Sequence, residues 1–192
     1  MIQNLLNTIE SCVALNKEDI ALCEAYFEPV LYPKNRIIEE EGQIPRYLYF
    51  VVSGFIRLFS YDKDGNEVTS HINCPPGFIT SYRHFSDQVP AGENLECISE
   101  CHLLRISKKD LDYIINESPA LKDFSIWVFQ QSMSYNENRA KALATLTAED
   151  RYLHFMKSHP DVLHNVPLQY IASFLGMNPK SLSRIRKKIT GR

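Results

Sequence analysis

The sequence predicts an α+β fold, in which a small β-roll lies between short N-terminal helices and a helical C-terminal third. Between about residues 31 and 106 the chain breaks into short runs rich in β-branched and aromatic residues, and turn signals separate these runs. After residue 107 the apolar residues recur at helical spacing instead. Hydrophobic residues make up 44% of the 192 residues, which is enough for a packed core.

The first 30 residues are predicted to form two short helices. Leu5 and Ile9 belong to an apolar stripe with helical spacing. Asn16 can cap a second helix, because its side chain can accept a hydrogen bond from an unpaired backbone amide in the first turn.

Four runs are then typical of strands: residues 47–52, 55–61, 68–72 and 103–106. Asp64-Gly65 lies between two of them and predicts a hairpin, because a tight turn needs the positive φ that glycine adopts without strain. Short strands at this spacing favour an antiparallel roll or sandwich over a parallel sheet, which would need intervening helices.

Three helices are predicted after the strands. One begins near Lys108 and is capped by Ser107, a longer one covers residues 119–146, and a third starts at residues 147–149 and ends at His159-Pro160. Ser118 can cap the longer helix, and Pro119 suits its first position. At 1.5 Å per residue, this helix is about 42 Å long, more than so small a domain needs for its own core. We expect two copies of the chain to pair along it; the alternative is that it lies on its own β-roll. The expected pairing face comprises Leu121, Phe124, Trp127, Val128, Gln131 and Tyr135.

The last 25 residues combine two short helices with a glycine turn. Pro167 begins the first helix, and Gly176 occupies a sharp turn that suits a residue without a Cβ atom. Asn178 can cap the second helix, and Pro179 takes its first position. Three apolar residues of this helix share one face: Leu182, Ile185 and Ile189. The pattern predicts a helix-turn-helix; a plain helical hairpin with a charged face is the alternative.

Basic residues are concentrated at the C-terminal end. Residues 150–192 hold eight Lys or Arg and two acids, whereas residues 1–149 carry a net charge of −8. A basic end on an acidic body indicates a polyanionic partner, although a solvated charged tail has the same composition. Together with the helix-turn-helix, this charge predicts that the second helix enters the major groove of double-stranded DNA. The residues expected to contact DNA are Gln169, Asn178, Pro179, Lys180, Ser181, Ser183, Arg184, Lys187, Lys188 and Arg192.

Four stretches give the chain a resemblance to the family of the cyclic-AMP receptor protein and the fumarate–nitrate regulator (Crp/Fnr): residues 47–59, 62–67, 101–111, and 171–176 with 182–184. The resemblance implies a cyclic-nucleotide-binding-like β-roll over residues 1–117, a dimerisation helix over 118–146 and a helix-turn-helix DNA-binding domain over 147–192. It also implies a homodimeric cytoplasmic transcription regulator. Its partners would be double-stranded DNA and a second copy of itself, with RNA polymerase as a further candidate.

The resemblance also assigns individual DNA contacts. The family's base-reading positions fall on Pro179, Lys180 and Arg184, and a phosphate-contacting position falls on Gln169. Lys180 stands where an acidic residue is common, so the DNA sequence preference is expected to differ from that of relatives. The chain ends at Arg192, soon after this helix, so the β-wing of most members is expected to be absent or a stub.

The expected effector pocket departs from the family pattern. Cyclic-nucleotide binders carry a Gly-Glu pair for the ribose and an Arg-Ser or Arg-Thr pair for the cyclic phosphate. By position these pairs fall on residues 80–81 and 91–92. Without a cation at Ala91, a buried phosphate would lack its counter-charge, so the effector is expected not to be cyclic AMP. The pocket residues are expected to be Thr80, Ser81, Tyr82, Arg83, Ala91 and Gly92.

No metal or cofactor is expected from the remaining motifs. Cys12 and Cys23 do not have the spacing of an iron–sulfur cluster, and the six histidines lack metal-ligand spacing, so haem and zinc are not supported either. Cys97 and Cys101 are expected to be core thiols, with a redox pair as the alternative. No nucleophile–base pair, phosphate loop, signal peptide or membrane span is evident, so we do not expect an enzyme or a membrane protein. The alternative function is a ligand-binding or protein-interaction module with a vestigial helix-turn-helix.

Overall fold

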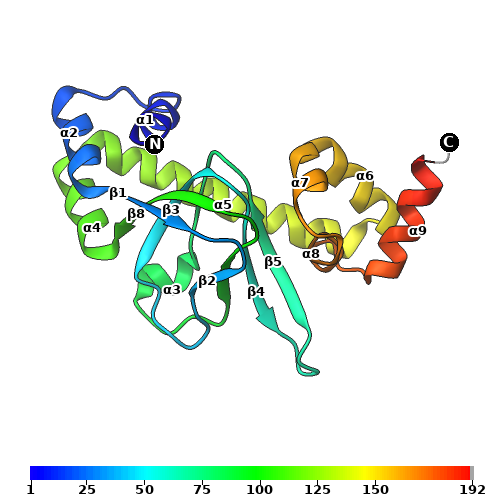
Figure 1. The fold of residues 1–192 in the computed structure, drawn as a ribbon. Coiled ribbons are helices and arrows are strands. Elements are labelled where there is room, and N and C mark those ends of the chain that lie inside the picture. The colour runs from blue at the N-terminus through cyan, green and yellow to red at the C-terminus, as the bar shows by residue number, and fades with distance from the viewer. Residues whose placement is uncertain (191–192) are drawn as a thin grey trace.

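The computed structural model describes residues 1–190 of the protein. The strands are β1 (Glu28–Tyr32), β2 (Arg36–Glu39), β3 (Tyr47–Ser53), β4 (Ile56–Tyr61), β5 (Glu67–Asn73), β6 (Gly77–Ile79), β7 (Asn94–Cys97) and β8 (Cys101–Ser107). The helices are α1 (Ile2–Glu10), α2 (Lys17–Tyr26), α3 (Tyr82–Asp87), α4 (Lys108–Glu117), α5 (Pro119–Thr145), α6 (Ala148–Ser158), α7 (Pro160–Asn165), α8 (Leu168–Phe174) and α9 (Pro179–Thr190). The strands occupy one half of the elongated molecule, α6–α9 occupy the other, and α5 joins the two (Figure 1).

The strands form a β-roll of two antiparallel four-stranded sheets. Their orders are β1-β8-β3-β6 and β2-β7-β4-β5. Side chains from both sheets, such as Tyr49, Ile56 and Leu103, meet in a buried core between them. Strands β4 and β5 form the predicted hairpin, whose turn contains Gly65 at a φ of 80°. The hairpin projects from the roll on the same side as α8 (Figure 1).

The predicted fold class is confirmed, and so are the predicted caps. Asn16 and Asp19 form a reciprocal capping box at the start of α2. Ser107 and Ser118 accept hydrogen bonds from backbone amides in the first turns of α4 and α5. The strands β1, β2, β6 and β7 and the helices α3 and α7 were not predicted. These elements are short, and β7 is buried along its whole length, so it shows no alternation of apolar and polar residues.

The two sides of α5 have different neighbours, and this corrects the expected pairing face. Leu121 and Phe124 are buried in the core shared with α1, α2 and α4, and Val128 packs against the same cluster. Tyr135 stacks on Phe174 of α8. These four residues therefore pack within the chain's own fold, as the alternative interpretation of this helix predicted. Trp127 and Gln131 are exposed. Ile126, Phe129 and Met133 are exposed over 48%, 49% and 57% of their surface, although Phe129 also borders an apolar cavity lined by Leu121 and Phe124.

Helices α6–α9 surround a second core, which includes Tyr152, Phe155, Ile171 and Leu182. Gly176, between α8 and α9, has a φ of 66°, and a Cβ atom there would lie 2.7 Å from Cδ2 of Leu143. Both the backbone conformation and the close approach of α5 explain why this turn holds glycine. The predicted helix-turn-helix is confirmed as a fold.

Candidate nucleic-acid interface and roll pocket

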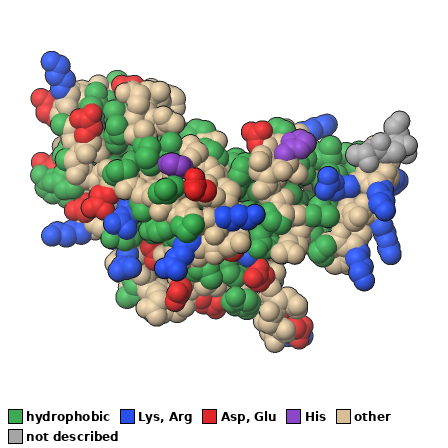
Figure 2. All heavy atoms as spheres, viewed as in Figure 1, with side chains coloured by type: hydrophobic (Ala, Val, Ile, Leu, Met, Phe, Trp, Pro, Cys, Tyr) green, Lys and Arg blue, Asp and Glu red, His purple; other side chains and the backbone are tan. Residues whose placement is uncertain are grey.

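Helix α9 is held by local and buried contacts that turn its basic side outward. The Asn178 side chain accepts a hydrogen bond of 2.8 Å from the backbone N–H of Ser181. Leu182 is fully buried, and Ile185 and Ile189 pack against the same core. Because these apolar residues share one face, the basic residues project from the end of the molecule, where Lys and Arg side chains gather (Figure 2).

Most of the residues expected to contact DNA are accessible. Lys180, Arg184 and Lys187 are exposed, and Ser181 and Ser183 are half-buried. Gln169, Asn178 and Pro179 are also exposed and line one groove. Arg192 lies outside the described residues.

Lys188 has an acidic partner within the chain. Its Nζ atom lies 2.6 Å from Oε2 of Glu149 on α6. An exposed ion pair of this kind contributes about 0–1 kcal/mol, but it competes with a phosphate for the same cation. The expected phosphate contact by Lys188 is therefore weakened.

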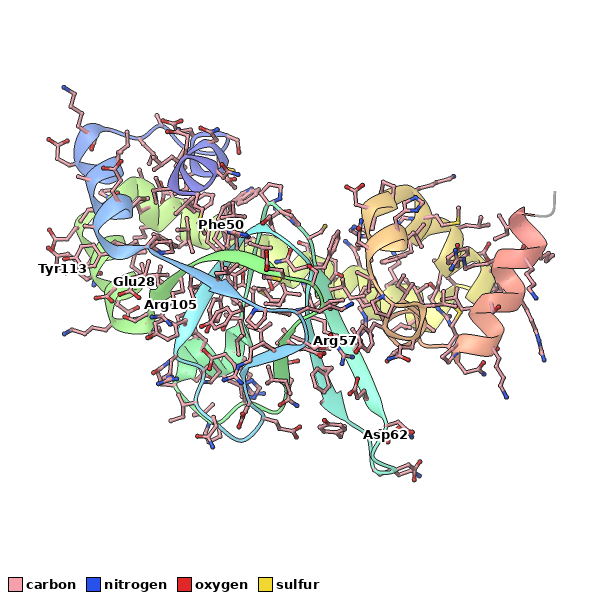
Figure 3. The ribbon with its side chains drawn as sticks, in the orientation of Figure 1. Glu28, Phe50, Arg57, Asp62, Arg105 and Tyr113 are labelled. Atoms are coloured by element: carbon pink, nitrogen blue, oxygen red, sulfur yellow. The ribbon has the colours of Figure 1, made fainter. Side chains whose placement is uncertain are left out.

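The groove beside the helix-turn-helix has an acidic opposite wall. This wall belongs to the β4–β5 hairpin and includes Asp62 and Glu67. Hydrogen bonds from the backbone and side chain of Asn66 lower the pKa of Asp62, so the Asp62 carboxylate is charged at neutral pH. Asp62 lies near the hairpin tip (Figure 3). DNA that approached Gln169 or Asn178 in this arrangement would meet this negative charge.

The hairpin is bonded to helix α8. The hydroxyl of Ser173 accepts a hydrogen bond of 2.9 Å from the backbone N–H of Thr69 and donates one of 3.2 Å to the carbonyl of Glu67. These bonds connect the edge of the roll directly to the first helix of the helix-turn-helix. The position of that helix therefore depends on the position of strand β5.

A buried arginine strengthens the same connection. Arg57 of β4 donates hydrogen bonds to the carboxylates of Glu96 and Glu67, and its guanidinium carbon lies 4.1 Å from the centre of the Phe59 ring. The Tyr170 ring of α8 covers it, and Arg57 lies where the roll meets α8 (Figure 3). Arg57 was not predicted as a functional residue from the sequence. The signal available was one charged residue within an apolar strand, which indicates a buried and paired cation.

His71 of β5 and Arg139 of α5 lie where the roll, α5 and α8 meet. The His71 ring lies 4.4 Å from the Tyr135 ring of α5. Burial, together with the nearby cation of Arg139, lowers the pKa of His71 to about 4. Arg139 donates hydrogen bonds of 3.1 Å to the carbonyls of Thr69 and Phe174, so it joins β5 to α8 from the side of α5.

The residues expected to form the effector pocket are only partly brought together. Thr80 and Ser81 are buried, and the Thr80 hydroxyl donates to the carbonyl of Tyr47. Arg83 points away from the roll, because its side chain is 86% exposed and lies 3.9 Å from Asp87. Ala91 is buried, whereas Gly92 is exposed.

Tyr82, another residue of the expected pocket, faces elsewhere. It lines a separate apolar cavity of about 200 Å³ with Phe85 and Phe124. Burial raises the pKa of its hydroxyl. The expected pocket is therefore divided between two parts of the roll.

A carboxylate is the main charged group beside Ser81. Glu93 accepts a hydrogen bond of 2.6 Å from Ser81 and one of 2.9 Å from Ser70. Among the described ion pairs within 4 Å, none involves Glu93. A cyclic phosphate here would meet a negative charge rather than a guanidinium, so these residues do not fit a cyclic nucleotide bound through its phosphate.

Cys97 and Cys101 are both buried free thiols in the roll core. The interaction between the two thiols, together with burial, raises the pKa of Cys97. Within residues 1–190, no three His, Cys, Asp or Glu side chains gather as a metal-ion site would require. No helix among the described residues is long and apolar enough to cross a membrane.

Comparison with known proteins agrees with the fold. Residues 29–118 match the family described as cyclic nucleotide-binding domain. The chain is similar to Crp/Fnr regulators in sequence and in structure. A cyclic AMP receptor protein of Thermus thermophilus is 28% identical over 105 residues, which are 55% of this chain and 48% of that protein. The chain thus aligns with about half the length of this curated relative.

Two solved structures illustrate the structural similarity. FixK2 of Bradyrhizobium japonicum superposes with a TM-score of 0.76 at 16% identity, covering 86% of this chain and 85% of that one. CLP of Xanthomonas campestris, described as a c-di-GMP-responsive global regulator, superposes with a TM-score of 0.70 at 21% identity and covers 92% of each chain. At these sequence identities the two structures establish the fold alone.

Proposed function

We propose that the protein is a cytoplasmic, homodimeric, DNA-binding transcription regulator of the Crp/Fnr type, without catalytic activity, whose effector is not cyclic AMP. The observation that carries the proposal is α9, whose buried Leu182 and capped start present Lys180, Arg184 and Lys187 to solvent. A major-groove helix needs this arrangement, with a base-reading N-terminal half and phosphate-neutralising cations. Arg184 would donate two hydrogen bonds to a guanine, and Lys187 would neutralise a phosphate.

The second copy would pack on the exposed side of α5. Ile126, Phe129 and Met133 recur at spacings of three and four residues, so they form one stripe. With 3.6 residues per turn, this stripe lies roughly opposite Tyr135 and about a third of a turn away from Arg139, and both of these residues face the chain's own fold. A pair of chains joined here would place two copies of α9 on neighbouring DNA half-sites, which lie about 34–36 Å apart.

A mobility-shift assay with a salt titration tests the proposal. We expect the affinity of the full chain for its DNA site to fall steeply with salt, and we expect Arg184→Ala with Lys187→Ala to abolish specific binding. Lys34→Ala removes an exposed cation from the turn between β1 and β2, away from both α5 and α9, and should leave binding unchanged. Binding that ignores salt, or that survives the double substitution, would contradict the proposal.

A further inference from the structure

A cavity of about 500 Å³ lies between the C-terminal half of α5 and α6, and the end of α8 closes it on a third side. Leu143, Phe155 and Phe174 supply an apolar wall. The basic and imidazole side chains at its surface are Arg139, Lys141, Arg151, His154 and His159. None of the described residues that line the cavity is Asp or Glu.

Neither cavity arginine has an acidic partner. Arg151 donates hydrogen bonds to the carbonyls of Leu146 and Leu175, at 2.7 and 2.8 Å. Arg139 likewise bonds only carbonyls, and its Nε atom is buried without a hydrogen-bond partner. Among the described ion pairs within 4 Å, none involves either residue. The guanidinium carbon of Arg139 also lies 4.9 Å from the centre of the Phe174 ring. Partly buried guanidinium groups that contact carbonyls and an aromatic ring but no carboxylate form a site of positive potential that favours an anion.

We propose that this cavity binds a small organic anion, a carboxylate or phosphate monoester on an aromatic or aliphatic body. Its volume lies within the range of about 300–1,000 Å³ that is usual for small-molecule sites. The phenyl rings of Phe155 and Phe174 would cover the apolar body, while the guanidinium and ammonium groups would pair with the anionic head. The expected roll pocket, where Glu93 supplies a carboxylate, is unsuited to this ligand.

The simplest alternative is that the two arginines only cap the C-terminal carbonyls of α8. Capping accounts for the bonds of Arg139 and Arg151 to Phe174 and Leu175. It does not account for the Nε atom of Arg139, which is buried without a hydrogen-bond partner. Nor does it explain why the described lining residues include Lys141 but no Asp or Glu. Capping alone also predicts that anionic and neutral aromatic molecules bind equally well.

An anion bound in this cavity would affect the helix-turn-helix through Arg139 and Arg151. Both hold carbonyls at the end of α8, directly before the turn at Gly176. An anion that drew either guanidinium toward itself would weaken these bonds and free α8 from α5. This coupling rests on the proposed function, because its effect would be a change in DNA affinity. A second chain on the Ile126–Met133 stripe would leave the cavity open, since the stripe lies on the other side of α5.

The test uses the full chain and follows the ring C–H resonances of His154 and His159 by NMR. The probes are phenyl phosphate and benzoate, with benzyl alcohol as the neutral aromatic and inorganic phosphate as the anion without a body. We expect phenyl phosphate to bind at least tenfold more tightly than benzyl alcohol and more tightly than inorganic phosphate. Equal affinities for phenyl phosphate and benzyl alcohol, or no saturable shift with any probe, would overturn the proposal.

Two substitutions localise the site without touching the capping arginines. Lys141→Gln removes a cation from the wall, and Ala142→Trp fills the cavity, so both should weaken phenyl phosphate binding about tenfold or more. Lys122→Gln on the same helix is the matched control and should have no effect. Unchanged binding in both cavity variants would overturn the proposed location.

A mobility-shift assay with and without phenyl phosphate tests the coupling separately. We expect saturating phenyl phosphate to change DNA affinity in the wild-type chain but not in Ala142→Trp. Probe binding without a change in DNA affinity would overturn the coupling. DNA binding that is absent under all conditions would instead overturn the proposed function, and the NMR result would still decide whether the cavity binds anions.

Discussion

The guanidinium carbon of Arg57, on strand β4, lies 3.5 Å from the centre of the Tyr170 ring on helix α8. A buried charge of the roll is therefore covered by a side chain of the helix-turn-helix. This contact, together with the hydrogen bonds of Ser173, joins the two halves of the molecule at the face where α8 would approach DNA.

Replacing Tyr170 with leucine is expected to weaken the packing of α8 against strands β4 and β5. The change removes a cation–π contact, which is worth about 2 kcal/mol when desolvated, but it leaves an apolar side chain in place. Hydrogen–deuterium exchange should become faster at the amides of β5 and α8, while those of β3 and β8 should stay protected. Tyr170→Phe keeps the ring and should exchange like the wild type. Unchanged exchange in Tyr170→Leu would show that the contact contributes nothing.

Removing the charge of Asp62 is expected to strengthen DNA binding. Asp62→Asn keeps an oxygen that can accept the hydrogen bonds of the turn, but it removes a negative charge from the wall facing Gln169 and Asn178. We expect a gain of about two- to fivefold at low salt, which should shrink as screening increases. Glu24→Gln, at an exposed position on α2, is the control. A gain of equal size in both variants would point to net charge rather than to the hairpin.

Although Lys187 and Lys188 are adjacent in the chain, their substitutions are expected to change the salt dependence of DNA binding by different amounts. Lys187→Ala should reduce the slope of log affinity against log salt by about 0.9, the value for one phosphate contact. Lys188→Ala should reduce it less, because Lys188 already pairs with Glu149. Equal reductions would mean that the pair with Glu149 opens on DNA.

The two sides of α5 are expected to respond differently to substitution. Met133→Glu places a charge in the exposed stripe and should convert a dimer to a monomer that remains folded, as measured by analytical ultracentrifugation. Gln131→Glu, at an exposed position away from the stripe, should leave the dimer intact. Leu121→Ala should instead lower the free energy of unfolding by about 2–5 kcal/mol, because Leu121 is buried in its own chain. A dimeric Met133→Glu variant would place the pairing surface elsewhere.

The protein is expected to lose stability as the pH falls from about 6.5 toward 4. His71 is neutral in the folded chain, where its pKa is about 4, whereas in the unfolded chain it takes up a proton near pH 6.5. The unfolded state therefore binds more protons in this window, so the free energy of unfolding decreases, by on the order of 3 kcal/mol when the pH falls through the whole window. His71→Phe keeps an aromatic ring against Tyr135 and should flatten this dependence in urea unfolding at pH 5 and pH 7. An equally steep dependence in the variant would assign it to other groups, such as His159, whose pKa burial also lowers.

Much of the secondary structure and the candidate DNA-reading helix could be predicted from the sequence. The caps at Asn16, Ser107 and Ser118, the turn at Gly65 and the helix-turn-helix around Gly176 all follow from residues a few positions apart. Such features depend on backbone geometry and local hydrogen bonds, so contiguous residues suffice to specify them. The departure of the roll pocket from a cyclic-nucleotide site could also be inferred, because the sequence shows that Ala91 offers no cation.

Only the tertiary structure decided which surfaces these elements use. Periodicity placed Leu121 and Phe124 on one face of α5, but it could not tell whether a partner or the chain's own core covers that face. Several contacts join residues that are far apart in the chain. They are the contact of Arg57 with Tyr170, the ion pair of Lys188 with Glu149, and the hydrogen bonds of Arg139 and Arg151 to the carbonyls of Phe174 and Leu175. Their partners depend on how helices and sheets pack, and packing depends on the whole set of buried side chains, which no local pattern contains.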